Sequence, residues 1–593
     1  MIKKLIRQML TAQIFSALTV SLCLMIDSIM IGRFLGVGAI AAYQYANPLL
    51  LILGAFSTML SAGVQVACSR SLGRGSKEET DKGYSSALFV GLATAVVFLL
   101  IVILFRSPLA TALGAGTKES NPEVYEATRA YMLGFVIGAP AMMLALVLVP
   151  FLQMGGKSTL LIFSVLTMTV ADVVLDLLNV YVFEGGMFGM GLASSISYYA
   201  ALLVALIYFL SKKCAFSFSF KLISRAKMRE VFQGGLPAVF AMASTVVMIF
   251  VMNHLLNSTG GTNSVAAFSV IQNIGNSANC ITTGVGGVSL TLAGILYNED
   301  DRNGLREMLR QLCLDSLFLG LLMGALIAVF SPYLAALFLK EAGEARTLAT
   351  LGIRIYAFCL VPCCMNGALK NYYQATEKPT LTVIISILES AVLSSLFALI
   401  LSIPFGTTGA WFYAALGETV TLILIGVYVF VRTKKLPWKD DAILLLDDDF
   451  SVPPEDLLEI TVKTPEEAFD ASIKAGEFCE NKGGNEESKL RISLIVEEMA
   501  ENVVQHGFTK DSKPHQLDIR MLSKKDLWVL RFRDDCRPFD PVSYVPREGK
   551  SAAGIRLALA MADDSRYTNS LSMNNLTMTL NKEAFSSAKD AVL

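Results

Sequence analysis

Four polar side chains interrupt stretches that are otherwise apolar, and their chemistry suits a cation site. Asp27 breaks one aliphatic run, and Asp172, Asp176 and Asn179 break another. Spacings of four and three place the last three on one stripe of a helix. A carboxylate is expensive in hydrocarbon, so such residues face a wet cavity or a partner. Their oxygens can bind Na⁺, or accept protons when burial raises the pKa. The alternative is polar contact between helices.

Three groups of residues near the C-terminal end suit nucleotide chemistry. Glu498 and Asn502 are four residues apart and share a helix face. A carboxylate there can activate a hydroxyl group, and an amide oxygen can hold Mg²⁺. Asp534 ends a strand-like run, where a carboxylate can accept the exocyclic amine of adenine. Residues 551–554 lead into a helix, whose N-terminus favours phosphate. Glu498 alone would be a solvated helix charge, but the three groups together predict a nucleotide site.

The elements that position the first group lie in a membrane. The chain is 54% hydrophobic and 17% charged, whereas soluble chains carry about 25% charged residues. A helix needs roughly 20 apolar residues to cross a bilayer. The sequence predicts spans near residues 10–31, 46–68, 84–105, 127–152, 160–183, 190–210, 231–256, 268–297, 310–331, 348–374, 380–402 and 409–432.

Basic residues orient these predicted spans. Of the 30 Lys and Arg residues up to Lys439, 23 fall on the side of the N-terminus and 7 on the opposite side. Cytoplasmic loops carry the excess of Lys and Arg. We therefore expect a multi-pass protein of the cell membrane with both termini in the cytoplasm. Asp27 and the lack of a small-residue cleavage site indicate a first membrane helix, not a cleaved signal peptide.

The two sets of six predicted spans resemble each other. Three short motifs recur in order at offsets of 225, 221 and 220 residues: 40–43 with 265–268, 153–157 with 374–378, and 186–189 with 406–409. Because six is an even number, both halves have the same orientation, as in transporters that rock two bundles about a central cavity. Glu389 and Glu418 are acids of the second half, and the sequence assigns them no role.

Several classes of function are disfavoured by what the sequence lacks. The net charge is −1 and no basic stripe with interleaved aromatics occurs, which argues against a nucleic-acid partner. The ten cysteines show neither zinc-ligand spacing nor a paired framework, so they are expected to be packing residues. No Gly-x-x-x-x-Gly-Lys loop is present, which argues against an ATP-driven primary pump.

The membrane region resembles the MATE family, the multidrug and toxic compound extrusion transporters. The similar motifs are Asp27–Gly36 in the first span, Ser69–Gly75 after the second, Gln153–Lys157 and Gly189–Ser194. The resemblance spans roughly residues 5–435. It implies a V-shaped pair of six-helix bundles that exports amphiphilic small molecules in exchange for Na⁺ or H⁺. By position, it implies a cation site at Asp27, Asp172 and Asp176, with Ser194 at a hydroxyl position of the sixth helix. Relatives can carry Asn at the position of Asp172, which leaves the ion open.

The C-terminal region has the pattern of an α+β sandwich, with helices packed on one face of a mixed sheet. Residues 457–464, 515–523, 527–534, 566–571 and 575–580 are expected to be strands, and 465–481, 486–508 and 554–562 helices. Roughly residues 455–585 resemble the GHKL ATP-binding fold, most closely the anti-sigma-factor serine kinases. The resemblance implies that Glu498 is the general base, Asn502 the Mg²⁺ ligand and Asp534 the adenine-binding residue. It places Gly554 in the lid over the phosphates.

Two departures from the GHKL pattern narrow the expected pocket. Cys536 stands where the family has Gly, and Arg556 stands at the second Gly of the lid. A side chain there occupies space that backbone should use to approach the nucleotide. Arg556 can instead reach a phosphate as a charged donor. Mg²⁺-ATP binding remains expected, and kinase activity less so.

The combined sequence evidence predicts four regions and leaves three alternative hypotheses for the function. The regions are two six-helix halves at 1–215 and 216–435, a linker at 436–455, and an ATP-binding-like domain at 456–593. The first hypothesis is a cation-coupled exporter whose cytoplasmic tail senses nucleotide or a regulatory protein. The second is a membrane-anchored signalling protein with a serine-kinase tail. The third is a lipid-linked or polysaccharide flippase of the same superfamily. Membrane lipid and a small-molecule substrate are the expected partners.

Overall fold

The computed structural model describes residues 2–35, 37–113, 115, 122–211, 214–339, 343–447, 450–510, 515–544, 553–571 and 573–582. These residues form two compact units. The first comprises Met1–Arg70, Glu79–Gln153 and Ser158–Leu446, and the second comprises Asp447–Leu593 with the short segments Ser71–Glu78 and Met154–Lys157. The first unit is helical, and the tail, from Asp447 onward, contains the sheet.

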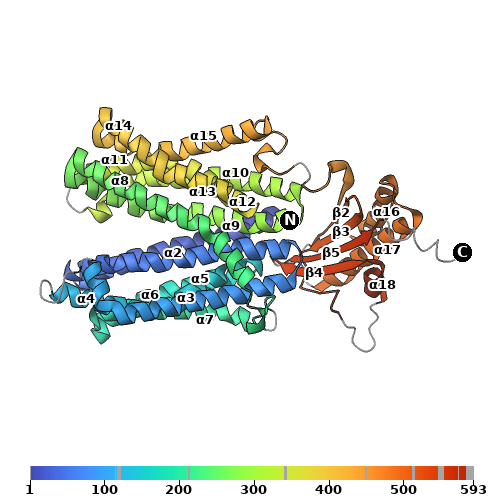
Figure 1. Ribbon diagram of the computed structural model, residues 1–593, viewed down its shortest axis with the longest axis horizontal. Coiled ribbons are helices and arrows are strands. Elements are labelled where there is room, and N and C mark those ends of the chain that lie inside the picture. The colour runs from blue at the N-terminus through green and yellow to red at the C-terminus, as the bar shows by residue number, and fades with distance from the viewer. Residues whose placement is uncertain are drawn as a thin grey trace. The chain divides into compact units, whose positions relative to one another are not determined.

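The first half of the membrane unit consists of long apolar helices. They are α1 (Ile2–Met30), which continues as the π-helical turn η1 (Ile31–Leu35), α2 (Val37–Gly73), α3 (Lys77–Ala112), α4 (Pro122–Val136), α5 (Ala139–Met154), α6 (Ser158–Leu178), the π-helical turn η2 (Asn179–Phe183) and α7 (Gly186–Phe209). Helix α6 packs against α1 and α7, and α4 packs against α7. These helices run from blue to green in Figure 1.

The second half repeats this pattern. Its elements are η3 (Phe220–Leu222), α8 (Arg225–Ala278), α9 (Cys280–Asn298), α10 (Arg302–Phe338), α11 (Glu344–Tyr356), η4 (Ala357–Cys359), α12 (Leu360–Ala375), α13 (Pro379–Ser386), the π-helical turn η5 (Ile387–Val392), α14 (Leu393–Ala410) and α15 (Tyr413–Thr433). Helix α12 packs against α9, α10 and α15, while α8 packs against α11 and α14. Contacts between α1 and α9 join the two halves within the unit.

The helices are long and apolar enough to cross a bilayer. Among the described residues, ten helices meet this criterion, or eleven when the pair Pro122–Val136 and Ala139–Met154, bent by 46°, counts as one span. The remaining predicted span coincides with α1, which is not among the ten. Large apolar side chains such as Leu104, Phe250 and Ile403 are exposed on the outer faces. In hydrocarbon these side chains need no protein cover, so the exposure is what a lipid-facing surface requires.

The internal repeat is visible in the backbone as well as in the sequence. Three pairs of residues with positive φ occur at the offsets found in the sequence: Gly75 and Asp300 (69° and 52°), Gly156 and Glu377 (67° and 65°), and Gly186 and Gly406 (55° and 56°). A non-glycine residue rarely adopts a positive φ. Matching left-handed turns at matching positions therefore indicate that the two halves share one path of the chain.

Part of the segment predicted as a linker is built into the membrane unit. The 3₁₀ turn η6 (Ala442–Leu444) is buried. On α12, the Tyr372 hydroxyl donates to the Leu444 carbonyl and the Tyr373 hydroxyl to the Ile443 carbonyl, each at 3.0 Å. Arg306 forms an ion pair with Asp441. We call residues 441–445 the strap; they are fastened to helices α10 and α12.

The tail is a five-stranded sheet covered by helices on one face (Figure 1). Its elements are η7 (Pro454–Asp456), β1 (Leu457–Val462), α16 (Pro465–Asn481), α17 (Glu486–Asn502), the π-helical turn η8 (Val503–Gly507), η9 (Phe508–Lys510), β2 (Leu517–Ser523), β3 (Leu527–Asp534), α18 (Ala553–Met561), β4 (Asp564–Ser570) and β5 (Met573–Asn581). The strand order is β1-β2-β3-β5-β4. The expectation of a mixed sheet was wrong, because every adjacent pair of described strands is antiparallel. β3 and β4 run in the same direction, but β5 lies between them.

Local sequence explains how the covering helices begin and pack. The Thr464 hydroxyl accepts from the Glu467 amide, and Asn485 accepts from the Ser488 amide, so each helix has an N-cap. Such a cap is worth about 1 kcal/mol. Helices α16 and α17 bury Ala471 and Ile495 against sheet residues that include Leu530. This packing fixes α17, and hence its last turn, over the sheet.

Candidate functional site

Carboxyl groups from two helices meet inside the first half of the membrane unit. Asp27 comes from α1, and Asp172 and Asp176 come from α6, with side chains 6%, 4% and 1% exposed. Asp27 interacts with the Asp172 carboxyl group and with the Ser194 hydroxyl group on α7. Asp176 lies close enough to act on Asp172 electrostatically. The structure thus brings together four of the five residues predicted for a cation site.

Several oxygens of this cluster are buried without a hydrogen-bond donor. They are Oδ1 of Asp27, Oδ1 of Asp172 and both carboxylate oxygens of Asp176. A buried carboxylate without a counter-charge is costly. A proton or a monovalent cation bound among these oxygens would remove that cost. The arrangement therefore has the chemistry of a site that binds one small cation.

Asn179 points away from the carboxyl cluster. Its side-chain amide donates to the Gly186 carbonyl at 3.1 Å. Its Oδ1 occupies the space that a side chain at Gly185 or Gly189 would need. Asn179 is the first residue of the π-helical turn η2, which follows α6.

Two residues beside the cluster were missed by the sequence analysis. The Ser197 hydroxyl donates to the Ser194 carbonyl at 2.8 Å and lies near Asp172, and Tyr43 on α2 lies near Asp27 and Asp172. Ser197 follows Ser194 by three residues, so both lie on one face of α7. That spacing was the available signal. Tyr43 belongs to a motif that was noticed only as part of the repeat.

A second buried ionic cluster lies in the other half of the membrane unit. On α12, Lys370 pairs with Glu389 of η5, and Asn366 donates to the Glu418 carboxylate of α15 at 2.8 Å. Glu389 Oε2 and Asn366 Oδ1 are buried without a partner. Lys370 neutralises one of the two acids. The sequence analysis left Glu389 and Glu418 unassigned and counted Lys370 only among the 23 basic residues on the side of the N-terminus, although a lysine in an apolar helix is itself a signal.

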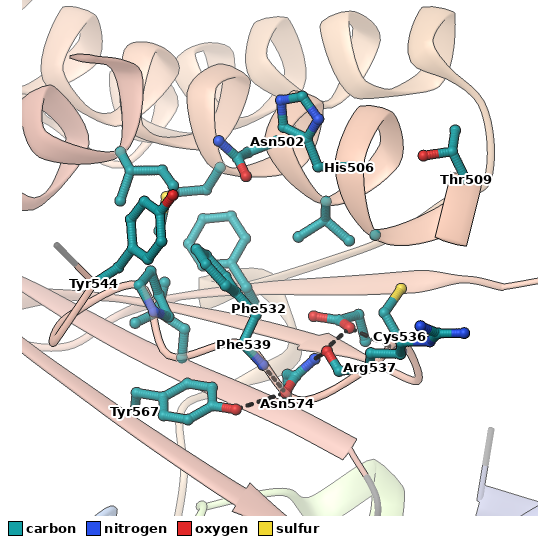
Figure 2. A pocket seen from close by; sticks show the side chains of 17 residues that line it. Asn502, His506, Thr509, Phe532, Cys536, Arg537, Phe539, Tyr544, Tyr567 and Asn574 are labelled. Carbon is teal, nitrogen blue, oxygen red and sulfur yellow. Dashed lines mark hydrogen bonds between the residues drawn. The ribbon is translucent and has the colours of Figure 1, made fainter. Parts of the chain in front are cut away.

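The tail contains a cavity of about 490 Å³. It lies between the sheet and the helical segment formed by α17 and η8. Figure 2 shows Asn502 and His506 on the helical side and Phe532, Cys536 and Asn574 on the sheet side. Phe539 and Tyr544 bring further aromatic rings, with centroids 5.0 Å apart. An aromatic wall facing polar groups suits a flat heterocycle with amine and ring-nitrogen substituents.

Asp534 lies in this cavity at the end of β3. Its Oδ1 accepts from Asn574 Nδ2 at 2.8 Å and from the Cys536 amide at 3.0 Å. Asn574 Oδ1 in turn accepts from the Tyr567 hydroxyl at 2.6 Å, as Figure 2 shows. Burial raises the pKa of Asp534, and the donor groups of Asn574 and Cys536 oppose that rise. The carboxylate is thus held in place as an acceptor whose charge is only partly compensated.

Of the remaining predicted residues of the tail, one lines the cavity and the others lie near the start of α18. Asn502 lines the cavity together with Asp534. Glu498 lies one turn earlier on α17, and its carboxylate fills the space next to Gly554 at the start of α18, where a side chain would collide with it. Arg556 is exposed, and of α18 it is Ile555 that lines the cavity. Residues 551 and 552 of the predicted lid lie outside the described residues.

Comparisons with known proteins match these two units to two families. A sequence profile of the MatE family matches residues 12–178 and, a second time, 237–400. A profile described as a histidine kinase-like ATPase domain matches residues 463–580. The two MatE matches cover the two halves that share the repeat.

Curated relatives and solved structures resemble the membrane unit. The chain is 22% identical over 405 residues to "Multidrug export protein MepA" of Staphylococcus aureus. The alignment covers 67% of this chain and 86% of the relative. The MepA protein of Staphylococcus saprophyticus is 22% identical over 402 residues with the same coverage. A crystal structure of MATE in complex with MaL6 has a TM-score of 0.67 at 20% identity, covering 73% of this chain and 96% of that one. A MOP superfamily transporter from Pyrococcus furiosus also gives 0.67 at 20% identity, covering 74% and 97%.

Proposed function

Since the chain belongs to the MatE family of multidrug efflux transporters, we propose that it exports amphiphilic small molecules in exchange for Na⁺ or H⁺. The observation that carries the coupling is the group of buried carboxyls at Asp27, Asp172 and Asp176, whose oxygens lack donors. A bound cation would neutralise the group in one state of the transporter. Release of that cation would leave charge that only a wet, open state tolerates.

Transport in vesicles tests this proposal. The full-length protein is reconstituted in liposomes, and uptake of ethidium is followed under an imposed Na⁺ or H⁺ gradient. We expect one of the gradients to drive transport, and Asp27→Asn to abolish it. Glu123→Gln, which removes an exposed acid at the start of α4, is the control and should transport normally. Gradient-driven transport by Asp27→Asn at the normal rate would overturn the assignment of the site.

The tail is proposed to bind Mg²⁺-ATP and to adjust transport. The cavity beside Asp534 and Asn502 supports this role, with Asn502 as the Mg²⁺ ligand, Asp534 as the adenine acceptor and Glu498 as the base in any phosphoryl transfer. Gly554 and Arg556 would cover or contact the phosphates. A ligand that binds only the folded state raises thermal stability by mass action. Mg²⁺-ATP should therefore raise the unfolding temperature of the wild-type protein but not of Asp534→Asn; equal shifts would contradict the site.

The signalling hypothesis predicts a different outcome from the same protein. Because the Glu498 carboxylate lies at the N-terminus of α18, a phosphoryl group held there would be within its reach. Transfer of labelled phosphate from ATP to a cytoplasmic regulatory protein, lost in Glu498→Gln, would favour a serine kinase. A flippase would instead move a lipid-linked sugar and leave ethidium transport absent in the wild type.

We propose that both termini face the cytoplasm of the cell that carries the protein in its membrane. The support is the distribution of basic residues, 23 against 7. A green fluorescent protein fused to the C-terminus should be fluorescent, and an alkaline phosphatase fused there should be inactive. The opposite pattern would reverse the orientation and would separate the tail from cytoplasmic ATP.

A further inference from the structure

Three side chains with metal-binding atoms converge at the edge of the tail cavity. The ligand atoms of His515, Asp535 and Cys536 all lie within 4.8 Å of one another. His515 Nδ1 is 3.0 Å from Asp535 Oδ1. The His515 and Cys536 side chains are almost fully buried, whereas that of Asp535 is partly exposed. The group therefore has one face open to solvent.

Strand pairing brings these residues together. β2 and β3 are antiparallel, with Leu517 opposite Asp534. Continuing that register by two residues places His515 opposite Cys536, where side chains of neighbouring strands approach each other. The Gln516 amide donates to Asp535 Oδ1 at 3.2 Å, and the Phe508 ring stacks on the His515 ring with centroids 5.8 Å apart. Both the carboxylate and the imidazole are thus oriented before any ion binds.

We propose that His515, Asp535 and Cys536 form a binding site for a divalent transition-metal ion of the Zn²⁺ type. Imidazole nitrogen, carboxylate oxygen and thiolate sulfur are the three ligand types that Zn²⁺ takes in proteins. Around such an ion, ligand atoms lie roughly 3.3–3.8 Å apart, so small side-chain rotations suffice. With the thiolate and the carboxylate ionised, the two negative charges balance the charge of the ion. Three protein ligands leave a fourth position for water or an anion.

An ion bound to Cys536 would also affect the neighbouring cavity. Cys536 lines the cavity, and its amide donates to Asp534. An ion on the Cys536 thiolate would therefore fix the turn that carries the Asp534 acceptor. The metal site itself does not depend on nucleotide binding, so the two proposals can fail separately.

Metal counting on the full-length protein tests the site. The protein is purified in detergent, stripped with a chelator and titrated with Zn²⁺ against a chromogenic chelator. We expect wild type to bind one equivalent more than His515→Ala, Asp535→Asn or Cys536→Gly. Cys479→Ala, which removes another buried thiol of the tail, should bind as wild type does. Equal numbers of ions in wild type and the three site variants would overturn the proposal.

Cobalt substitution identifies the sulfur ligand. Co²⁺ bound through a thiolate gives a charge-transfer band in the near ultraviolet, which should appear in wild type and Cys479→Ala. It should be missing in Cys536→Gly. Cys536→Gly removes the thiol but keeps the backbone amide that donates to Asp534, so it is expected to fold, and its normal thermal unfolding in the metal-free state is the control. A band of undiminished intensity in Cys536→Gly would show that the ion binds elsewhere.

Discussion

Asp534 carries a charge that the folded tail buries. Burial raises the pKa of Asp534 in the folded state above the ordinary value of 3.8, which holds in the unfolded chain. At a pH between the unfolded and the folded pKa, the folded state therefore holds more protons than the unfolded chain. Stability then falls as the pH rises through this window, and above the folded-state pKa the whole cost is present. The residue at the centre of the proposed nucleotide site is therefore one that weakens the empty domain.

Replacing Asp534 by Asn should stabilise the empty tail at neutral pH. The amide keeps Oδ1 as an acceptor for Asn574 and Cys536 but carries no charge. We expect slower hydrogen exchange of the β3 amides in the variant at pH 7, and no difference from wild type below about pH 3.8. A variant that is less stable than wild type at pH 7 would show that burial of the charge costs nothing.

Gly186 and Gly406 hold backbone conformations that a side chain strains. Both have positive φ, and a Cβ would meet no atom within 4 Å at either position. The cost of Gly406→Ala is thus conformational, about 1–3 kcal/mol for a sparsely populated backbone region, and should be visible as a lower unfolding temperature. Gly54→Ala is the matched control, because that site is also open but lies inside helix α2 without a positive φ, so alanine should not lower stability there. A similar loss in both variants would exclude backbone strain as the cause.

Helix α12 connects two features at the scale of elements. Its central part carries Asn366 and Lys370 toward the buried acids, and its end carries Tyr372 and Tyr373 toward the strap. A rotation of α12 would disturb both sets of contacts. One helix thus joins the ionic cluster of the second half to the segment that leads into the tail.

Removing Lys370 should destabilise the second half strongly. Lys370→Met leaves the Glu389 carboxylate buried and without its counter-charge, which typically costs about 3–5 kcal/mol. We expect a clearly lower unfolding temperature for the full-length protein in detergent. The double variant Lys370→Met/Glu389→Gln removes both charges and should recover most of the loss. If the double variant is no better than the single one, packing and not charge is responsible.

Elements with strong local signals were predicted well, and those set by packing were not. Helix α16 (Pro465–Asn481) and strand β3 (Leu527–Asp534) have the predicted bounds, since a cap and clear periodicity define them. The Asn179 side chain donates to the Gly186 carbonyl, a contact to the segment after α6 that the spacing of Asp172, Asp176 and Asn179 did not predict. The strap was missed because a run of five apolar residues, Ala442–Leu446, is too short to show a period.

The same division applies to the candidate sites. Asp27, Asp172 and Asp176 were found because acids in apolar runs are conspicuous. The grouping of His515 with Cys536 could not be found from spacing, since 21 residues separate them and only the register of β2 with β3 brings them together. Contacts made by strand pairing are invisible to rules that compare neighbours along one helix.

At the scale of the whole molecule, the strap marks the C-terminal boundary of the membrane unit. Truncation after Leu446 keeps Ala442–Leu445 on the membrane unit, whereas truncation after Lys435 removes it. The shorter protein loses two hydrogen bonds to Tyr372 and Tyr373, each worth about 1 kcal/mol, and exposes the apolar surface beneath.

We therefore expect the protein truncated after Leu446 to keep the thermal stability of its membrane unit. The protein truncated after Lys435 should unfold at a lower temperature in detergent. Ethidium transport is then measured with and without ATP for the full-length protein and for this longer truncation. An effect of ATP that only the full-length protein shows would report regulation by the tail. Loss of stability in both truncations would mean that the strap is not the boundary.

The three pairs of positive-φ turns are also what duplication of a six-helix ancestor would leave. At Gly75 and Gly156 the turn is made by glycine, while their counterparts Asp300 and Glu377 make the same turn with side chains that disfavour it. A six-helix ancestor that was duplicated and joined end to end would leave this trace, since the path of the chain changes more slowly than the residues along it. Divergence then gave one half a group of aspartates and the other a lysine with two glutamates. The two halves thus inherited one scaffold and evolved separate ionic interiors.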